Sequence, residues 1–200
     1  MEQFLVVALA HFLALLIPGV DFFLIARTSM ASGWRNASGV CVGIAVANGA
    51  CITAAFTGLS LVTQPMILDA TQLLGGVFLT YVGVSFFRAR VKVELDDERT
   101  GRSSWTRNFG LGLASGLLNP KNVLFYVSLA AALTDASWPA LVFYGAWMVS
   151  VVLVWDLFVA VALGSARAVT ALSRYLPWMT KIAGGFLVAL GVGMIVGLVV

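Results

Sequence analysis

Six long apolar stretches strongly limit how this chain can fold. Of its 200 residues, 60% are hydrophobic and only 10% are charged, whereas ordinary soluble domains carry about 25% charged residues. A helix of ~20 apolar residues can cross the ~30 Å hydrocarbon layer of a bilayer and satisfies its own backbone hydrogen bonds. The stretches that meet this length are Phe4–Ala26, Gly39–Thr63, Met66–Phe87, Phe109–Thr134, Ala140–Leu163 and Ile182–Val200. The sequence therefore predicts an all-α membrane protein with six transmembrane helices.

The first apolar stretch has a cleaved secretory signal as its alternative interpretation. The chain opens Met1-Glu2-Gln3 without a basic segment, and its apolar span is longer than the apolar core of a signal peptide, which has about 7 to 15 residues. We therefore interpret this stretch as a retained transmembrane helix.

The positions of the basic residues predict an orientation, because Lys and Arg in short loops are held on the cytoplasmic side. Eleven of the twelve basic residues follow the first, third or fifth stretch, and Lys121 lies inside the fourth. The eleven are Arg27, Arg35, Arg88, Arg90, Lys92, Arg99, Arg102, Arg107, Arg167, Arg174 and Lys181. Both termini are thus expected outside the cytoplasm. No basic groove with interleaved aromatic residues points to nucleic acid.

One hydrophilic segment, residues 88–108, separates two groups of three stretches and is predicted to be a solvated cytoplasmic linker. The groups, residues 1–87 and 109–200, show a weak internal similarity. The segment Gly75–Gly83 of the third stretch resembles Gly184–Gly191 of the sixth, at an offset of about 108. Since each group holds three helices, the second group must be inverted in the membrane, as in many secondary transporters.

Two prolines interrupt corresponding helices of the two groups. Pro18-Gly19 lies in the first stretch and Asn119-Pro120 in the fourth. Proline lacks a backbone donor and clashes with the carbonyl four residues earlier, so backbone polar groups are freed inside the membrane. Each break alone is a kink that a membrane helix tolerates. Paired breaks in corresponding helices instead indicate the binding site of a transporter.

Charged side chains lie beside both breaks. Asp21 follows Pro18, Lys121 follows Pro120, and Asp156 lies in the fifth stretch. A charge at the centre of a membrane helix costs about 2.5 to 3.5 kcal/mol on insertion scales and normally faces a cavity or a partner. At ~1.5 Å per residue, Asp21, Asp156, Asn48 and Lys121 fall in one layer, ~8 to ~18 Å from the cytoplasmic helix ends. Lys121 can pair with one aspartate as a structural ion pair, and the other is then left to bind a cation or a proton.

The segments Pro18-Gly19-Val20-Asp21 and Leu118-Asn119-Pro120-Lys121 resemble signature segments of the lysine/threonine exporter (LysE/RhtB-type) superfamily. The resemblance covers the whole chain in length, helix number and charge pattern. The family usually has Pro-Gly-Pro in the first segment, so Val20 is a departure that removes one helix breaker. The resemblance implies proton-driven export of amino acids or close derivatives from the bacterial cytoplasm, with a homodimer as one arrangement. We expect no cofactor, and the distribution of basic residues places both termini on the periplasmic side of the inner membrane.

A binding mode follows as a hypothesis. Lys121 and a positive half-helix end would receive the α-carboxylate of the substrate. Asp21 or Asp156 would receive its α-ammonium, and a proton that enters from outside would neutralise one of these two carboxylates. The expected substrate-binding residues are Pro18, Gly19, Asp21, Asn48, Asn119, Pro120, Lys121, Asn122 and Asp156, with Asp21 and Asp156 as the proton-coupling residues.

The remaining motifs carry less functional information. His11, the single histidine, is interpreted as a helix-packing residue rather than a proton relay. Cys41 and Cys51 lie ~15 Å apart along one helix, too far for a disulfide. The small-residue motifs allow close helix approach within the chain or between two copies, and they are Gly39-x-x-x-Gly43, Gly112-x-x-x-Gly116 and Gly193-x-x-x-Gly197.

Two other function classes fit the sequence less well than a secondary transporter. An enzyme would need a catalytic constellation, but no nucleophile and base are evident and one histidine excludes a metal site with two. A passive channel, which we keep as the alternative, would need a polar stripe along several helices. The second, third and sixth stretches hold too few polar residues for one.

Overall fold

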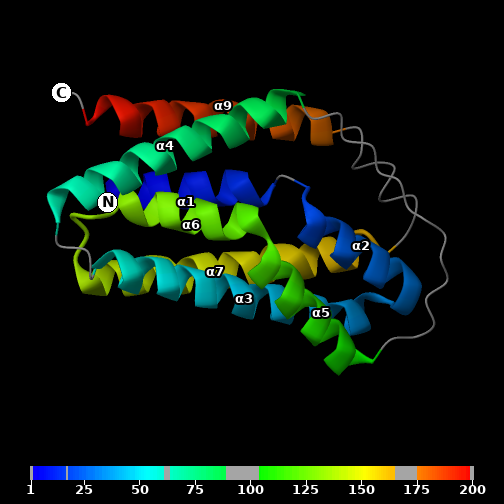
Figure 1. Cartoon of the computed structure of the whole chain (residues 1–200). Helices are drawn as coiled ribbons and strands as arrows, with labels where there is room; N and C mark the ends of the chain where they lie inside the picture. Colours follow the sequence, from blue (N-terminus) through cyan, green and yellow to red (C-terminus); the bar gives the residue numbers. More distant parts are fainter. Residues whose placement is uncertain (1, 17, 61–63, 89–103, 165–174, 199–200) are drawn as a thin grey trace.

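The computed structural model describes residues 2–16, 18–60, 64–88, 104–164 and 175–198. Within these residues the chain forms eight helices and no strand. The helices lie alongside one another in an elongated bundle (Figure 1). They are α1 (Glu2–Leu15), α2 (Val20–Ser32), α3 (Trp34–Ser60), α4 (Pro65–Arg88), α5 (Trp105–Leu118), α6 (Pro120–Ala131), α7 (Trp138–Ala162) and α9 (Leu176–Val196).

Each of the six predicted stretches is helical, and the two that contain the predicted breaks are interrupted there. The first stretch consists of α1 and α2, which are bent by 54° relative to each other. The fourth stretch consists of α5 and α6, with Asn119 between them in an extended conformation (φ −78°, ψ 106°). Pro120 is the first residue of α6, where its missing N–H costs no helix hydrogen bond. Both predicted breaks are confirmed.

Some helix ends differ from the expected boundaries. Helix α2 continues past Ala26 to Ser32, so Arg27 lies in a helix and not in the expected loop. The chain turns at Gly33, whose φ of 78° favours glycine, and α3 begins directly afterwards. Between α4 and α5, residues 89–103 of the expected linker lie outside the described residues.

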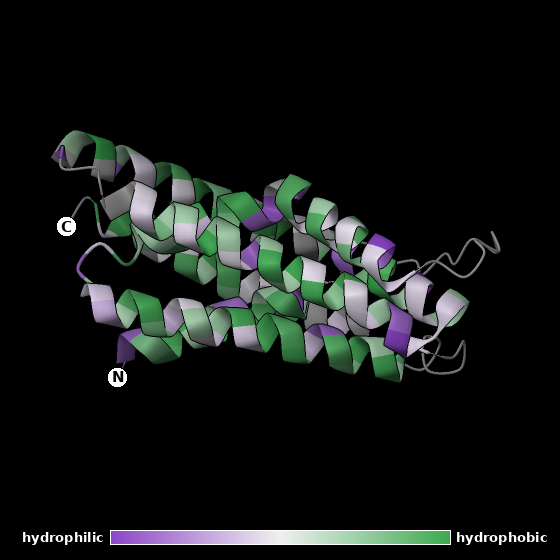
Figure 2. Cartoon of the chain, turned by 90° about the horizontal axis from the view of Figure 1, so that it is seen from below, coloured by the Kyte–Doolittle hydropathy of each residue, from purple (hydrophilic) through white to green (hydrophobic). Residues whose placement is uncertain are grey.

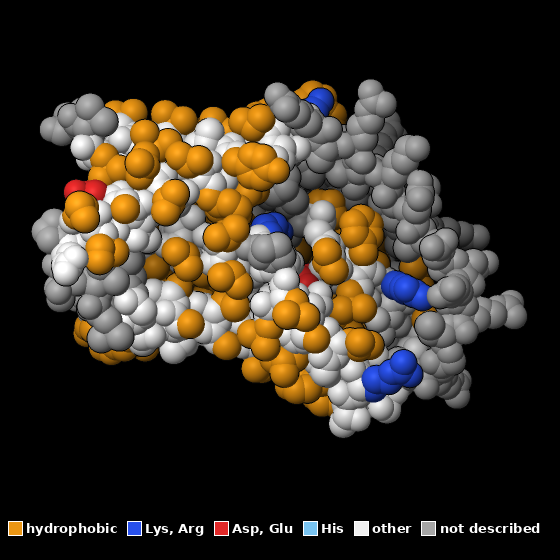
Figure 3. Space-filling model, viewed as in Figure 1, with side chains coloured by type: hydrophobic (Ala, Val, Ile, Leu, Met, Phe, Trp, Pro, Cys, Tyr) orange, Lys and Arg blue, Asp and Glu red, His pale blue; other side chains and the backbone are white. Residues whose placement is uncertain are grey.

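The surface of the bundle suits a hydrocarbon solvent. In the described part of the chain, α3 and α7 are each long and apolar enough to cross a membrane, and α1 with α2 makes a third candidate when counted as one bent span. Apolar residues dominate the ribbon in Figure 2 and the surface in Figure 3. On α7, for example, Val154 is 68% exposed and Phe158 is 59% exposed. Such continuous exposed apolar surface is typical of a membrane protein.

Glycines bring two pairs of helices into close contact. Helix α5 lies along α3, and a β-carbon on Gly112 would collide with the backbone carbonyl of Val40. Helix α9 lies along α4, and a β-carbon on Gly191 would be 2.5 Å from the carbonyl oxygen of Gly76. Small residues let helix backbones approach where no hydrophobic effect drives them together. The predicted motifs of α3 and α5 therefore serve packing inside the chain.

Two hydrophobic clusters divide the core along the bundle. One contains residues of α2, the first part of α3 and the last part of α7, such as Ile25, Val40 and Val159. The other contains residues of α1, α4, α6 and α9, together with the later part of α3 and the earlier part of α7. Along α3 the first cluster ends at Ala45 and the second begins at Ile52, so Asn48 lies between them. The polar layer expected from the sequence lies at this boundary.

Candidate functional site at the two helix breaks

The two helix breaks meet at a small cavity of about 40 Å³. Its polar side is formed by Gly19, Asp21, Asn48, Lys121, Asn122 and Asp156. Its apolar side is formed by Leu15, Phe22, Ile44, Val152 and Trp155. In the space-filling view, a basic and an acidic side chain are visible in a recess of a largely hydrophobic face (Figure 3). Residues from five helices and both breaks thus converge on one polar site.

Asp21, in the first turn of α2, is bound by side chains of the other broken helix. Its Oδ1 accepts a hydrogen bond from Ser115 Oγ at 2.5 Å. Its Oδ2 accepts hydrogen bonds from Asn119 Nδ2 and from Asn122 Nδ2, both at 3.2 Å. A carboxylate offers about four acceptor positions, so most of the capacity of Asp21 is used inside the protein. Asp21 therefore fastens α2 to the junction of α5 and α6.

Lys121 extends from the start of α6 to the break in the first helix. A β-carbon built on Gly19 would lie 3.7 Å from Lys121 Nζ. The ammonium group shares the cavity with Asp21 and Asp156, but among the described side chains it forms no ion pair with either. The structural ion pair that the sequence left open is not formed, so the ammonium group is available to an anion.

The two half-helices that begin at the breaks have different N-termini. At α6, Asn119 acts as the N-cap, and its Oδ1 accepts a hydrogen bond from the backbone N–H of Lys121 at 3.1 Å. At α2, Gly19 occupies the N-cap position and no side chain caps the helix. The first N–H groups of a helix have no partner within the helix and carry a partial positive charge. The uncapped end of α2 therefore adds to the positive side of the cavity.

Asp156 on α7 is the second carboxylate of the cavity and has very different surroundings. Its side chain is 6% exposed, and its Oδ2 has no hydrogen-bond partner among the described residues. Nearly all buried polar atoms in proteins are paired, so an unpaired one needs an explanation. A ligand with a hydrogen-bond donor would supply the missing partner. Asp156 is thus the carboxylate of this cavity that is open to such a ligand.

A chain of three buried polar side chains lies beside the cavity. Tyr126 donates a hydrogen bond from its hydroxyl to Asn48 Oδ1 at 2.7 Å. Because the single hydroxyl proton is used there, the Tyr126 oxygen accepts the contact with His11 Nε2 at 3.3 Å. His11 is 1% exposed, and its Nδ1 has no partner in the part of the chain that the structure describes. This chain joins α1, α6 and α3.

The structure brings most of the predicted site residues together and adds two others. Pro18 and Asn119 are not among the described residues that line the cavity, although they belong to the breaks beside it. The side chain of Pro120 lies outside what the structure describes. Ser115 and Tyr126 were not predicted. The signal for them is the spacing of Ser115, Asn119, Asn122 and Tyr126, which recur at i, i+4, i+7 and i+11 as polar positions along the fourth stretch. The break at Asn119 then separates Ser115 of α5 from the other two helical positions in α6.

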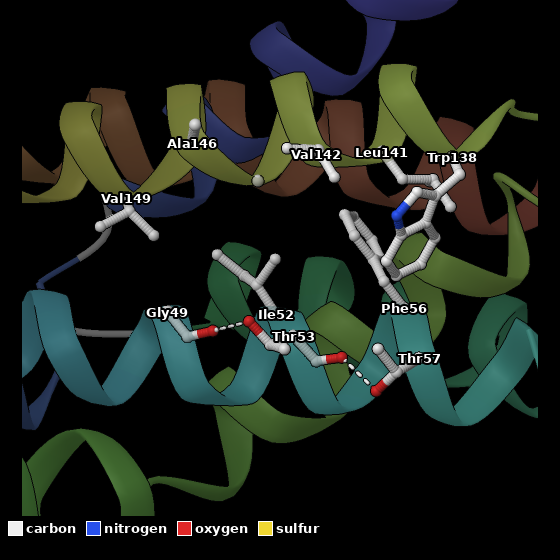
Figure 4. Close-up of a pocket in the computed structure, with 11 residues that line it drawn as sticks. Gly49, Ile52, Thr53, Phe56, Thr57, Trp138, Leu141, Val142, Ala146 and Val149 are labelled. Carbon is white, nitrogen blue, oxygen red and sulfur yellow. Dashed lines mark hydrogen bonds between the residues drawn. The ribbon is translucent and has the colours of Figure 1, made fainter.

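A second, larger cavity of about 440 Å³ lies between α3 and α7. Figure 4 shows Ile52 and Phe56 of α3 facing Val142 and Leu141 of α7. The hydroxyls of Thr53 and Thr57 are bound to carbonyl oxygens one turn earlier in α3, at 2.8 and 2.6 Å. The walls of this larger cavity are therefore almost entirely apolar. Of these two cavities, the smaller one has the charged groups that an ionic solute needs.

Comparisons with known proteins agree with one another. The model of the LysE type translocator family matches residues 12–197. The threonine efflux protein of Escherichia coli strain K12 is 26% identical over 209 residues, which cover 96% of this chain and 97% of that protein. The threonine efflux protein of Salmonella typhimurium is 25% identical, with 98% of both chains covered. The uncharacterized membrane protein YahN of Escherichia coli is 29% identical over 83% of this chain and 75% of its own length. No solved structure matches the chain. Because the family model covers nearly the whole sequence, the chain belongs to the LysE type translocator family.

Proposed function

We propose that this protein is a secondary transporter that exports amino acids from the bacterial cytoplasm across the inner membrane. The observation that carries the proposal is the single cavity at which the breaks of two helices meet three charged side chains. Broken helices and ionisable groups near the membrane midplane are the usual elements of a transporter site. The threonine efflux relatives support an amino acid as the solute.

Six transmembrane spans in a 3+3 inverted repeat are part of this proposal. Hydrogen bonds join α1 to α6 and α2 to α5, so the two broken helices run antiparallel with their breaks at one level. Asn48 and Asp156, which occupy the second helix of each group, line the same cavity. Both chain ends lie at the same end of the bundle in Figure 1, as an even number of spans requires. We place both termini on the periplasmic side.

The charges of the cavity support a defined orientation of the substrate. Its α-carboxylate is held by Lys121 and by the uncapped N-terminus of α2, both of which lie at Gly19. Its α-ammonium is held by Asp156, because most of the acceptor capacity of Asp21 is used by Ser115, Asn119 and Asn122.

The balance of charges also favours a class of amino acid. One free ammonium and one free carboxylate match the two charges of a zwitterion and leave no further charge for the side chain of the substrate. The apolar wall formed by Ile44 and Val152, among others, suits an uncharged side chain. Threonine, which the names of two relatives specify, is the first substrate to test.

Proton coupling completes the proposed mechanism. Asp156 binds either the substrate ammonium or a proton, and each displaces the other from the one open carboxylate. A proton that reaches Asp156 from the periplasm therefore releases the substrate there, and loss of the proton to the cytoplasm restores the site. The proton gradient is thereby coupled to export.

Purified protein in liposomes tests this proposal. We expect uphill movement of radiolabelled threonine or another neutral amino acid when a proton gradient is imposed, and no movement in empty liposomes. Asp156→Asn should abolish gradient-driven accumulation, because an amide cannot carry the proton, and should leave expression unchanged. Asp135→Asn removes an exposed carboxylate after α6 and serves as the matched control with normal activity.

Three results would contradict the proposal. If no amino acid of a full panel moves, the assigned solute class is wrong. If amino acids equilibrate at the same rate with and without the gradient, the protein is a passive channel. If Asp156→Asn accumulates substrate as the unmodified protein does, the coupling role of Asp156 is wrong.

A further inference from the structure

The charged cavity cannot accept an amino acid in the conformation seen here. An engineered cavity of about 150 Å³ in another protein binds benzene, whereas this cavity measures only about 40 Å³. An amino acid needs several times this volume. The side chains that close the cavity must therefore move during transport, and the structure shows which polar contacts would have to break.

On one side, the cavity is bordered by Asp21 of α2, which is bonded to Ser115 of α5. Ser115 precedes the break of its helix, and Asp21 follows the break of its own. The Ser115 hydroxyl and the Asp21 carboxylate are 2.5 Å apart. Apolar residues of α2 and α3, such as Ile25 and Cys41, pack beyond this bond with 0% exposure.

On the other side, the cavity is bordered by Asn48, from which the hydrogen-bonded chain continues to Tyr126 and His11. Here the order along the chain is reversed, because His11 precedes the break of its helix and Tyr126 follows the break of the other. All three side chains are at most 4% exposed. They lie toward the cluster that contains Leu129 and Met148.

We propose that these two sets of hydrogen bonds are the gates of the transporter and that they open in alternation. The first gate is Ser115 with Asp21, and the second is His11, Tyr126 and Asn48. The proposal rests on the export function proposed above. Each gate contains a bond between the half-helix before one break and the half-helix after the other. A rotation of α5 away from α2 therefore opens the first gate, and a rotation of α1 away from α6 opens the second.

Hydrogen bonds suit this task better than close apolar packing. Such a bond contributes little net free energy, because its partners can exchange it for water or for a ligand. A conformational equilibrium set by a few such bonds responds to the modest difference in affinity that a substrate or proton has for the two states. His11 Nδ1 has no partner among the described residues, so the second gate leaves one of its polar atoms without a described hydrogen bond when closed.

The two native cysteines of α3 provide a reporter for each gate. Cys41 packs in the cluster on the Ser115 side, whereas Cys51 packs against the cluster on the His11 side. Both thiols are free. With Cys41→Ala or Cys51→Ala as background, a water-soluble maleimide measures the accessibility of one thiol at a time in detergent-solubilised protein. This measurement requires no substrate, so it succeeds or fails independently of the export function.

Tyr126→Phe removes both hydrogen bonds of the second gate and keeps the ring. We expect it to raise the labelling rate of Cys51 about tenfold, as the loss of two ordinary hydrogen bonds implies, with no change at Cys41. Ser115→Ala should raise the labelling of Cys41 and leave Cys51 unchanged. His11→Phe, a second variant of the same gate, should reproduce the effect of Tyr126→Phe.

Two control variants separate gate opening from general loosening. Tyr144→Phe changes a buried tyrosine of α7 in the same cluster. Ser128→Ala removes a hydroxyl that donates to the carbonyl of Leu124 in its own helix α6. Neither should change either labelling rate. The proposal is overturned if the gate variants are labelled at the same rate as the unmodified protein. It is also overturned if one variant raises the labelling rates of both cysteines to a similar extent.

Discussion

At the scale of single residues, the two aspartates of the cavity are chemically identical but have different partners. Asp21 accepts three hydrogen bonds, whereas Asp156 Oδ2 accepts none from the described residues. Asparagine keeps one acceptor oxygen and replaces the other with an NH₂ donor. In Asp21→Asn this donor would face Ser115 or the donors of Asn119 and Asn122, so at least one hydrogen bond is lost.

This difference predicts that the same substitution lowers the stability at Asp21 but not at Asp156. Asp21→Asn should lower the free energy of unfolding by about 1 to 3 kcal/mol, the usual cost of leaving buried polar groups unpaired. Asp156→Asn should not lower it, because no hydrogen bond to a described group is broken. Thermal unfolding in detergent measures both, and a stability of Asp21→Asn equal to that of the unmodified protein would show that Asp21 does not fasten α2 to α5 and α6.

At the scale of helices, glycines determine which pairs approach most closely. Two glycines of α5 lie only two residues apart but on different faces. A β-carbon on Gly112 would collide with the backbone of α3 at Val40, whereas one on Gly110 meets no atom within 4 Å.

Alanine at the two positions should therefore act differently. Gly112→Ala should destabilise the protein by about 1 to 3 kcal/mol, because backbone atoms cannot yield as a flexible side chain does. Gly110→Ala, the matched control, should be neutral or slightly stabilising, since alanine favours a helix. The melting temperature in detergent checks the pair, and equal melting temperatures would mean that α3 and α5 do not pack as closely as the structure shows.

At the scale of the whole molecule, charge asymmetry and the proposed six spans predict where the termini lie. The described basic side chains visible in Figure 3, apart from the one in the central recess, lie away from the end that carries both termini in Figure 1. Basic ends of membrane proteins face the cytoplasm. Alkaline phosphatase fused after Val200 should therefore be active, because its disulfides form only outside the cytoplasm.

A fusion after Gly101, within the expected cytoplasmic linker, should give the reverse result and serves as the control. Green fluorescent protein should be dark when fused after Val200 and fluorescent when fused after Gly101. An active phosphatase at Gly101 together with an inactive one at Val200 would show that the protein has the opposite orientation.

Local chemistry explains why the sequence predicted the helices and their breaks. Apolar runs long enough to cross a bilayer have no other regular structure available, and proline acts on its own helix whatever surrounds it. For this reason the sequence could predict the breaks at Pro18 and Pro120. It could also predict one site shared by Asp21, Asn48, Lys121 and Asp156. The exact ends of α2 and α5 were not, because helix ends depend on caps and on neighbouring helices.

The sequence by itself determined an all-α, apolar chain with two broken helices, since length, hydropathy and proline are properties of local segments. Only the tertiary structure decided which carboxylate is free. Asp21 is bound by Ser115, Asn119 and Asn122, and Tyr126 links His11 to Asn48. Lys121 lies at Gly19 and forms no ion pair with a described residue. These arrangements depend on contacts between residues about 80 to 115 positions apart. Such contacts arise from the mutual placement of packed helices, which no local pattern of residues specifies.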